Sequence, residues 1–514
     1  MPARNNRHHI VGWLSKRRTQ DRRACATMDK NDRELPSLRE ECRQHPPERP
    51  CMISDKMLTQ EYFDIMNSLD GDIAGRKAAQ AYMEQSSAIV HQRVVGSSFV
   101  PRLYNAEVWD RFRFISETTH AILCKVIERY RSDATYRKIF DYDLRLVELA
   151  LLPRGYDAVL PFARVDIFLN EDTLKSAFCE INGDGSAGLN EDREIVQSIK
   201  ESETFATFAK AHHVESCELF ETWVKEFISI YDTFENKVEH PRFAICDYLD
   251  VGVVDEFRIF CTYFEQAGYE CVVADVRDLR FDGTSLRDSQ GLPINAIWRR
   301  SVTNDVIEHW DESQDLIAAV RQGAIALIGA FSGHIVHDKQ IFEALRHPLT
   351  KAFLTDEENA FVEEQIPLTH FLTDEDCDLL AIRNDKDAWI IKPTDAYGAR
   401  DVYAGISCTS EEWNALIDRF ANNAAGAPFL VQRYITPYQT NTLPPIADVP
   451  WLIEHGFMRE DDEKPPLHGI PYNNISGLYL FNGTFQGVFS RLGPLPEISK
   501  EHHGITAATI RVLD

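Results

Sequence analysis

The spacing of apolar residues divides the chain into helical and strand-forming parts. Over residues 57–148, apolar side chains recur every three to four positions, which predicts helices with one buried face. After Tyr156 the period falls to two, which predicts strands over residues 163–169 and 175–181 joined by a short turn. We therefore expect a helical region followed by a β-hairpin.

Further strands follow in two groups. A strand over residues 243–246, a helix over 256–267 and a strand over 270–274 form a strand–helix–strand unit, and short buried strands continue at 294–298 and 324–329. This pattern predicts a small Rossmann-like domain. The last part of the chain predicts strands over residues 388–392, 402–405, 429–435, 477–481 and 485–491.

The first fifty residues differ in composition from the rest. They contain few apolar residues and are rich in basic ones, with four arginines between positions 17 and 23. We expect a disordered leader over residues 1–55, or an extension upstream of a later start at Met52 or Met57; a functional basic arm is the alternative. The remaining chain is expected to divide into residues 56–238, 239–370 and 371–514.

Composition narrows the class of protein. The 514 residues carry a formal net charge of −26, which argues against broad binding to nucleic acid, because that needs a concentrated basic surface. No apolar run approaches the roughly 18 residues that cross a bilayer, so no membrane association is expected. The eleven cysteines include no CxxC pair and no zinc-spaced cluster, which predicts reduced thiols and a cytoplasmic protein without a structural metal.

Four polar residues are predicted to converge on the hairpin. Strand alternation places Arg164 and Asp166 on one face of the first strand, and Glu180 and Asn182 on one face of the second. The carboxylate and amide oxygens suit Mg²⁺, a hard cation that shares its coordination between protein and phosphate oxygens. The arginine suits a phosphoryl oxygen. An amphipathic hairpin with one wet face is the alternative.

A glycine-rich turn over residues 183–188 follows the second strand. Its glycines permit close approach of the backbone, and amides near Ser186 and Gly188 are candidates to bind an anionic substrate group. An ordinary loop has the same composition, so only the position after Asn182 favours the functional interpretation.

A nucleotide site is predicted in the last part of the chain. Lys392 ends a buried strand and runs into a loop over residues 394–401 that contains Gly398, an arrangement that can hold phosphates between an ammonium group and backbone amides. No GxxxxGK[ST] sequence is present. The strand over residues 429–435 contains Gln432 and is a candidate wall of an adenine pocket. A surface hairpin with a solvated lysine and an ordinary edge strand are the alternatives.

These motifs resemble the ATP-grasp fold in circularly permuted order, as in the glutathionylspermidine synthetase group. Arg164-x-Asp166 with Glu180-x-Asn182 resembles its metal-binding end, and Lys392 with Gly398 and Gln432 resembles its nucleotide-binding start, which here comes later in the chain. The resemblance implies an α+β fold: a helical region plus the metal-binding half over 56–238, a Rossmann-like pre-ATP-grasp domain over 239–370, and the nucleotide-binding half over 371–514.

The resemblance also implies roles for single residues. Asp166, Glu180 and Asn182 become Mg²⁺ ligands, and Arg164 the catalytic arginine near the transferred phosphoryl group. The nucleotide-binding residues become Lys392, Gly398, Gln432, Tyr434, Ile435, Arg491 and a second lysine. Either Lys339 or Lys351 fits as that second lysine, and we choose Lys351. Ser186, Gly188 and Arg300 are assigned to the substrate.

The implied activity is ADP-forming ligation. ATP would convert a small-molecule or peptide carboxylate to an acyl phosphate, and an amine would attack it to form an amide. The flap contains fewer glycines than in many relatives, and no amidase-like Cys/His arrangement precedes the ligase part, so a bifunctional enzyme is not expected. An ATP-grasp phosphotransferase and a non-catalytic ATP-binding scaffold remain alternatives.

Overall fold

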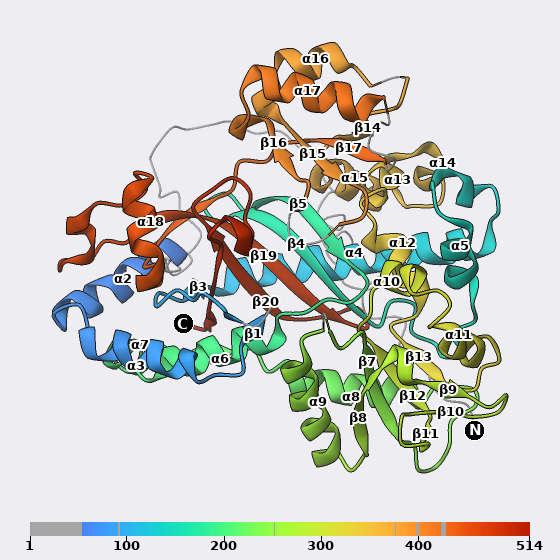
Figure 1. The fold of residues 1–514 in the computed structure, drawn as a ribbon. Helices are drawn as coiled ribbons and strands as arrows, with labels where there is room; N and C mark the ends of the chain where they lie inside the picture. The colour runs from blue at the N-terminus through green and yellow to red at the C-terminus, as the bar shows by residue number, and fades with distance from the viewer. Residues whose placement is uncertain (1–53, 91–92, 251, 376, 397–399, 423–427) are drawn as a thin grey trace, which may run out of the picture. The chain divides into compact units, whose positions relative to one another are not determined.

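A computed structural model describes residues 54–514, except 91–92, 251, 376, 397–399 and 423–427. The expected leader lies almost wholly outside these residues. The described chain mixes helices with several sheets, as expected from the sequence (Figure 1). In this part of the chain, none of the helices combines the length and the apolar character that a bilayer-crossing segment needs.

The largest sheet is built on the predicted hairpin. Strand β4 (Phe162–Asn170) and strand β5 (Lys175–Asn182) pair antiparallel, which confirms the hairpin, and β4 also pairs with β19 (Ile470–Phe481). β19 in turn pairs with β20 (Thr484–Gly493), β20 with β21 (Ile505–Ala507), and the start of β19 with β18 (Gln439–Thr442). The sheet therefore joins the predicted metal hairpin to the end of the chain.

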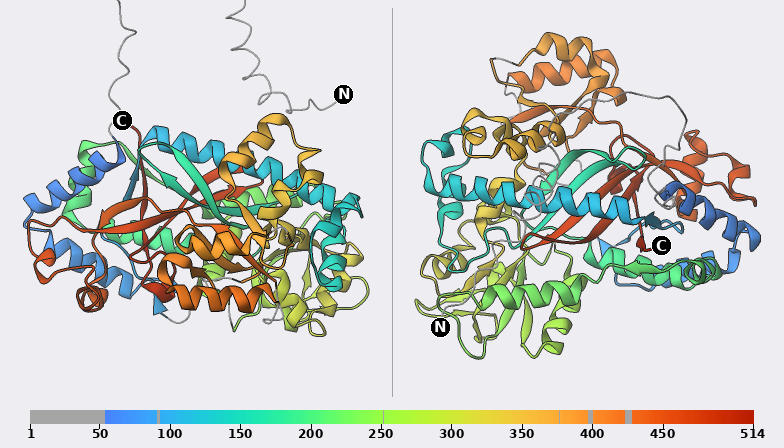
Figure 2. Two further views of the ribbon diagram at one scale, coloured as in Figure 1. Left: turned by 90° about the horizontal axis from the view of Figure 1, so that it is seen from above. Right: turned by 180° about the vertical axis from the view of Figure 1, so that it is seen from behind.

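The long helix α4 (Ala106–Ser132) packs on this sheet (Figure 2, right). Its buried residues recur at helical spacing, as at Ile115, Ile122 and Val126, and belong to the same core cluster as Val165 of β4 and Val488 of β20. Burial of a side chain of this size contributes roughly 1.5–3 kcal/mol. The helix thus fixes the back of the sheet that carries the hairpin.

A second antiparallel sheet contains the predicted nucleotide strands. Its order is β14 (Thr369–Phe371), β17 (Phe429–Arg433), β15 (Trp389–Pro393) and β16 (Tyr403–Ala404). Helix α16 (Leu379–Asn384) and helix α17 (Ser410–Ala421) complete this part, with Trp413 and Ile417 of α17 in one cluster with Ile391 and Val431. A capping box formed by Thr409 and Glu412 begins α17.

The middle of the chain forms a four-stranded parallel sheet. Its order is β13 (Ala326–Ile328), β12 (Ala296–Arg299), β7 (Phe243–Asp247) and β8 (Cys271–Asp275). Helix α8 (Phe220–Tyr231) packs on β13, and helix α9 (Val254–Gln266) on β8. These strands and α9 confirm the strand–helix–strand pattern predicted for this segment.

The helical pattern expected over residues 57–148 is interrupted by short strands between residues 89 and 104. Helices α2 (Asp55–Ser68) and α3 (Ile73–Glu84) are followed by three short strands, β1 (Ile89–Val90), β2 (Arg93–Val94) and β3 (Arg102–Tyr104). β3 is buried between β22 (Thr509–Val512) and the rest of the core, and pairs with β22, so this strand depends on a partner at the other end of the chain. Local periodicity cannot reveal such a pairing.

The remaining elements connect these parts. The helices are α5 (Leu144–Leu151), α6 (Leu189–Lys200), α7 (Glu203–Ala211), α10 (Thr303–Glu308), α11 (Gln314–Arg321), α12 (His334–His337), α13 (Ile341–Arg346), α14 (Pro348–Lys351), α15 (Asp356–Gln365) and α18 (Val449–Glu454). The short strands are β6 (Val214–Ser216), which pairs with β22, and β9 (Arg280–Phe281), β10 (Leu286–Arg287) and β11 (Pro293–Ile294), which form a small sheet of their own.

Candidate active site

The register of the hairpin brings the four predicted residues into two cross-strand pairs. Arg164 lies opposite Asn182, and Asp166 lies opposite Glu180. A β-bulge follows at once, because the next pair joins Ile167 to Phe178 and leaves Cys179 unmatched. The carbonyl of Cys179 instead accepts a hydrogen bond from Lys392 Nζ at 3.3 Å. Through this hydrogen bond, the bulge links the β4–β5 hairpin to strand β15, which carries Lys392.

Asp166 is completely buried between two arginines. Arg164 Nε donates to Asp166 Oδ1 at 2.7 Å and Arg164 Nη2 to Oδ2 at 3.0 Å, while Arg491 forms a further ion pair with Oδ2. Burial raises the pKa of Asp166, although both arginines oppose this shift. A cation at Asp166 would therefore have to compete with Arg491 for the carboxylate.

Gly477 makes room for this arrangement. It lies opposite Asp166 on β19, and a Cβ at this position would come within 2.8 Å of Asp166 Oδ1 and of Arg164 Cδ. Any side chain at residue 477 would therefore displace the arginine–carboxylate pair.

Glu180 differs from Asp166 in its surroundings. Its carboxylate is partly exposed and faces a pocket, with Arg491 Nη2 at 3.7 Å from Oε1. Burial opposes its ionisation, but Lys339 and Arg491 outweigh that effect and hold the pKa of Glu180 well below its usual range. The Glu180 carboxylate is therefore negatively charged at neutral pH and can offer its oxygens to a cation.

Two buried lysines face the same pocket. Lys339 and Lys392 are each 8% exposed, and within the described ranges no carboxylate lies within ion-pair distance of either ammonium group. Lys392 Nζ donates to Gln432 Oε1 at 2.9 Å, and Lys339 Nζ donates to the carbonyl of Ala396 at 2.8 Å. Burial lowers the pKa of Lys392. Buried cations without an acidic partner favour an anionic ligand.

The pocket is lined by residues of both antiparallel sheets. Its apolar walls come from β4, β5, β15 and β19, and its polar end from Glu180, Lys339, Lys392 and Arg491. The apolar lining residues are Phe168, Phe178, Ile390, Val402, Ile435 and Ile475. A pocket lined by apolar side chains and by several cations suits a molecule with an apolar ring and an anionic group.

Gln432, Tyr434 and Ile435 line this pocket, as predicted. Gln432 is 3% exposed, and its amide is oriented from both sides, because Nε2 donates to Thr369 Oγ1 at 2.9 Å while Oε1 accepts from Lys392. The amide therefore serves to position Lys392. The Tyr434 backbone N–H donates to the carbonyl of Ala388, which fixes the chain at the end of β17.

Lys351, chosen as the second lysine, does not line the pocket. It ends the short helix α14, and its Nζ pairs with Glu363 at 2.7 Å at a half-exposed position. Lys339, the other candidate, lines the pocket. Gly398 lies outside the described residues.

Arg164 and the predicted substrate residues lie outside the pocket lining. Arg164 Nη1 donates to the carbonyl of Ala187, and Ser186 Oγ donates back to the carbonyl of Asn182 at 2.9 Å. Gly188 begins α6 with φ of 103°, a conformation that favours glycine. Arg300 is buried against Trp298 and pairs with Glu256 at 3.3 Å. Their assignment to substrate stays a prediction.

Sequence reasoning missed the segment that closes the pocket after β20. Glu497, Ile498 and Ser499 line it, and Glu497 accepts hydrogen bonds from the Ala404 N–H and the Ser407 hydroxyl. This irregular segment carries no periodic pattern, so no sequence signal was available. The contacts join it to β16 in the second sheet.

The hairpin residues fit a hard cation. Glu180 offers carboxylate oxygens to the pocket, and Asn182, its neighbour on the same strand face, has a side-chain carbonyl oxygen that could join it. Oxygen-only donors beside an anion pocket suit Mg²⁺. Asp166 joins this set only after Arg491 moves.

Known proteins resemble this chain in structure rather than in sequence. No known family model matches the sequence, and no curated protein matches it. A putative gamma-glutamylcysteine synthetase from Methylobacillus flagellatus KT matches at 10% identity and a TM-score of 0.37, over 76% of this chain and 88% of that one. A RimK domain ATP-grasp protein from Sphaerobacter thermophilus matches at 14% identity and a TM-score of 0.26, over 48% and 90%.

A third solved structure has a higher TM-score and matches a larger share of both chains. It is a glutathione synthetase-like effector from Globodera pallida in its apo form, which matches at 9% identity and a TM-score of 0.55, over 90% of this chain and 98% of that one. At this identity the likeness concerns the fold alone. The chain therefore shares its overall fold with a glutathione synthetase-like protein.

Proposed function

We propose that this protein is an ATP-dependent ligase of the ATP-grasp type that joins a carboxylate to an amine. The observation that carries the proposal is the pair of buried lysines, Lys339 and Lys392, which have no carboxylate partner among the described residues and face a pocket that also contains Glu180. A nucleoside triphosphate supplies the anion that these cations lack. The shared fold with a glutathione synthetase-like protein supports this reading.

The shape of the pocket sets the orientation of the nucleotide. The base would lie between the apolar side chains near Ile390 and Ile435, where the backbone beyond Gln432 offers hydrogen bonds. The phosphates would extend to Lys339 and Lys392. Lys392 is already held by Gln432 and Cys179, so it is preorganised for binding.

Glu180, Asn182 and Asp166 would hold Mg²⁺. The ion would screen the negative charges that otherwise keep a carboxylate away from the γ-phosphate. Among the chain's own groups, Arg491 is the cation placed between Asp166 and Glu180, and we propose that it turns from Asp166 to the phosphates when the nucleotide binds. Arg164 would then hold Asp166 in place.

The proposed chemistry has two steps. An oxygen of the substrate carboxylate attacks the γ-phosphorus and ADP leaves, which gives an acyl phosphate. The amine then attacks the acyl carbon, phosphate leaves, and the amine loses a proton to give the amide. Both steps depend on positioning and on stabilised negative charge, so no nucleophilic side chain is needed.

We also propose the permuted order of the fold. Three observations support it: the metal hairpin precedes Lys392 in the chain, β4 pairs with the late strand β19, and the parallel sheet of β7, β8, β12 and β13 lies between the two halves in sequence. The proposed division into residues 56–238, 239–370 and 371–514 follows from the same order. We keep Ser186, Gly188 and Arg300 as proposed substrate residues.

The test is ADP release against panels of carboxylates and amines, with the mass of each product measured. A ligase releases ADP and, only when both substrates are present, yields a product in which they are joined with loss of water. A phosphotransferase yields a phosphorylated product without the amine. A binding protein releases no ADP above background with any pair.

A further inference from the structure

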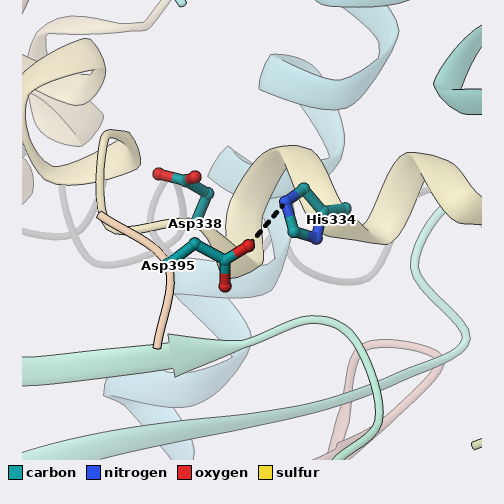
Figure 3. A group of neighbouring side chains, drawn as sticks. All are labelled: His334, Asp338 and Asp395. Atoms are coloured by element: carbon teal, nitrogen blue, oxygen red, sulfur yellow. Dashed lines mark ion pairs between the residues drawn. The ribbon is translucent and has the colours of Figure 1, made fainter. Parts of the chain in front are cut away.

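A second group of buried polar residues lies beside the pocket. His334 of α12, Asp338 directly after α12, and Asp395 two residues after β15 bring their side chains together (Figure 3). One ligand atom from each can be chosen so that all three lie within 4.8 Å of one another. Two ligand atoms at 2.0–2.2 Å from one ion are at most about 4.4 Å apart. The three side chains would therefore have to move only a few tenths of an ångström closer together to bind one ion.

His334 has no hydrogen-bond partner in the part of the chain that the structure describes. Its side chain is 1% exposed, and both ring nitrogens are buried without a hydrogen bond. The Nε2 atom is 3.5 Å from Asp395 Oδ2, and the Nδ1 atom is 3.6 Å from Asp184 Oδ2. An unsatisfied buried imidazole that is directed at a carboxylate points to a missing ligand between them.

Asp184 is placed to orient this imidazole. Its carboxylate is held by Arg299 at 2.6 Å and by the N–H and hydroxyl of Thr303. It faces Nδ1 and so leaves Nε2 for an ion. Metal-binding histidines commonly have a carboxylate on the other ring nitrogen, which fixes the tautomer.

The group nearest to the two other carboxylates that can carry a positive charge is His334. Among the described residues, no lysine or arginine lies within ion-pair distance of Asp338 or Asp395. Asp338 is 3% exposed and accepts from the Gln340 N–H through Oδ1 and from the Gln340 side-chain amide through Oδ2 at 3.5 Å, while Asp395 accepts from Asn304 through Oδ2. These donors are neutral amides, so none of them brings a positive charge.

We propose that His334, Asp338 and Asp395 form a binding site for a divalent transition-metal ion such as Mn²⁺ or Zn²⁺. One imidazole nitrogen and two carboxylates suit these ions, whereas oxygen-only sites suit Mg²⁺. The site is distinct from the hairpin of Glu180 and does not depend on the proposed ligase activity.

The ion would connect the two segments that carry the pocket lysines. Asp338 precedes Lys339, and Asp395 lies three residues after Lys392. These segments already touch, because the Lys339 N–H donates to the carbonyl of Thr394 at 2.8 Å. A bound ion would hold both lysines in a fixed relation, so metal loading is expected to raise the melting temperature.

The test is titration of the chelator-treated full-length protein with Mn²⁺ in the absence of nucleotide, with free Mn²⁺ followed by electron paramagnetic resonance. We expect about one ion per chain, displaced by Zn²⁺, and a loss of affinity of at least about tenfold in Asp395→Asn and His334→Gln. Asp395 is 20% exposed at the side chain, so its replacement should leave the chain folded. Circular dichroism checks both variants.

Asp401→Asn and Glu180→Gln are the matched controls. Asp401 lies in the same loop, is exposed, and has a φ of 57° that asparagine tolerates. Both controls should bind Mn²⁺ as the wild type does. The proposal is overturned if neither Mn²⁺ nor Zn²⁺ binds up to about 1 mM, if Asp395→Asn binds normally, or if Glu180→Gln abolishes binding, since the ion would then belong to the hairpin.

Discussion

Arg491 and Asp166 form an ion pair although 325 positions separate them in the chain. Gly477 lies opposite Asp166 on β19, and a Cβ there would come within 2.8 Å of Asp166 Oδ1 and of Arg164 Cδ. Because Asp166 has no exposure to solvent, its charge depends on Arg491 and Arg164. In the proposed mechanism, the same contact is what nucleotide binding must break.

Arg491→Met should therefore destabilise the fold. It leaves Asp166 with Arg164 as its only cationic partner, and we expect a cost of about 1–3 kcal/mol in the free energy of unfolding. Adding Asp166→Asn should recover part of that stability but none of the activity. Chemical denaturation of both single variants and the double variant measures this. Equal stability of wild type and Arg491→Met would show that the ion pair contributes nothing.

Glu180→Gln should abolish ADP formation with little loss of fold. The carboxylate lies at the pocket and its removal takes away a proposed metal ligand, so we expect turnover to fall at least about 100-fold, or about 2.7 kcal/mol in activation free energy. Asp172→Asn, in the turn of the same hairpin, is the control and should retain activity. Full activity in Glu180→Gln would refute the metal assignment.

The sequence predicted the β4–β5 hairpin and the facing of its polar residues for a physical reason. Strand alternation in β4 and β5 is local, so the facing pairs of Asp166 with Glu180 and Arg164 with Asn182 could be anticipated from spacing. The lysine at the end of β15 was found in the same way. The bulge at Cys179 was not predicted, because it involves a contact between β5 and Lys392, which is distant in the chain.

The errors concern contacts between distant segments. Lys339 and Lys351 are equivalent by spacing, and only the tertiary structure shows that one faces the pocket while the other pairs with Glu363. The pairing of β3 with β22 joins the two ends of the described chain. The cluster of His334, Asp338 and Asp395 also draws on two segments, so spacing alone could not reveal it.

Asp192 should make stability depend on pH. It is 1% exposed, and burial raises its pKa to about 7, above the value in the unfolded chain. The folded state thus binds a proton more tightly, so its contribution is fully present below about pH 4 and is lost as the pH rises through about 7.

Asp192→Asn has no carboxylate to ionise, so it should not lose stability at this position as the pH rises through about 7. We expect it to be more stable than wild type by at least about 1 kcal/mol at pH 8, with the difference shrinking at pH 5. The other buried acids are the same in Asp192→Asn and in the wild type, so their effect on the pH dependence of stability cancels in the difference between the two proteins. Asp64→Asn, at an exposed position on α2, should show no pH-dependent gain. A variant that is no more stable than wild type at pH 8 would contradict the assignment.

Deletion of Met1–Cys51 should leave melting temperature and nucleotide affinity nearly unchanged. The segment lacks apolar periodicity, and exposed charge pairs with the acidic remainder contribute under about 1 kcal/mol. Thermal melts and nucleotide titration of the truncated chain check this. A large loss of either quantity would show that the segment is part of the folded core.

Calorimetric titration with a non-hydrolysable ATP analogue and Mg²⁺ tests the nucleotide pocket most directly. Lys392→Met and Lys351→Met remove the same charge, but only Lys392 faces the pocket. We expect the wild type to bind one analogue per chain, Lys392→Met to bind at least about tenfold more weakly, a loss of about 1.4 kcal/mol, and Lys351→Met to bind as the wild type does. Absence of binding to the wild type, or an equal loss in both variants, would contradict the account.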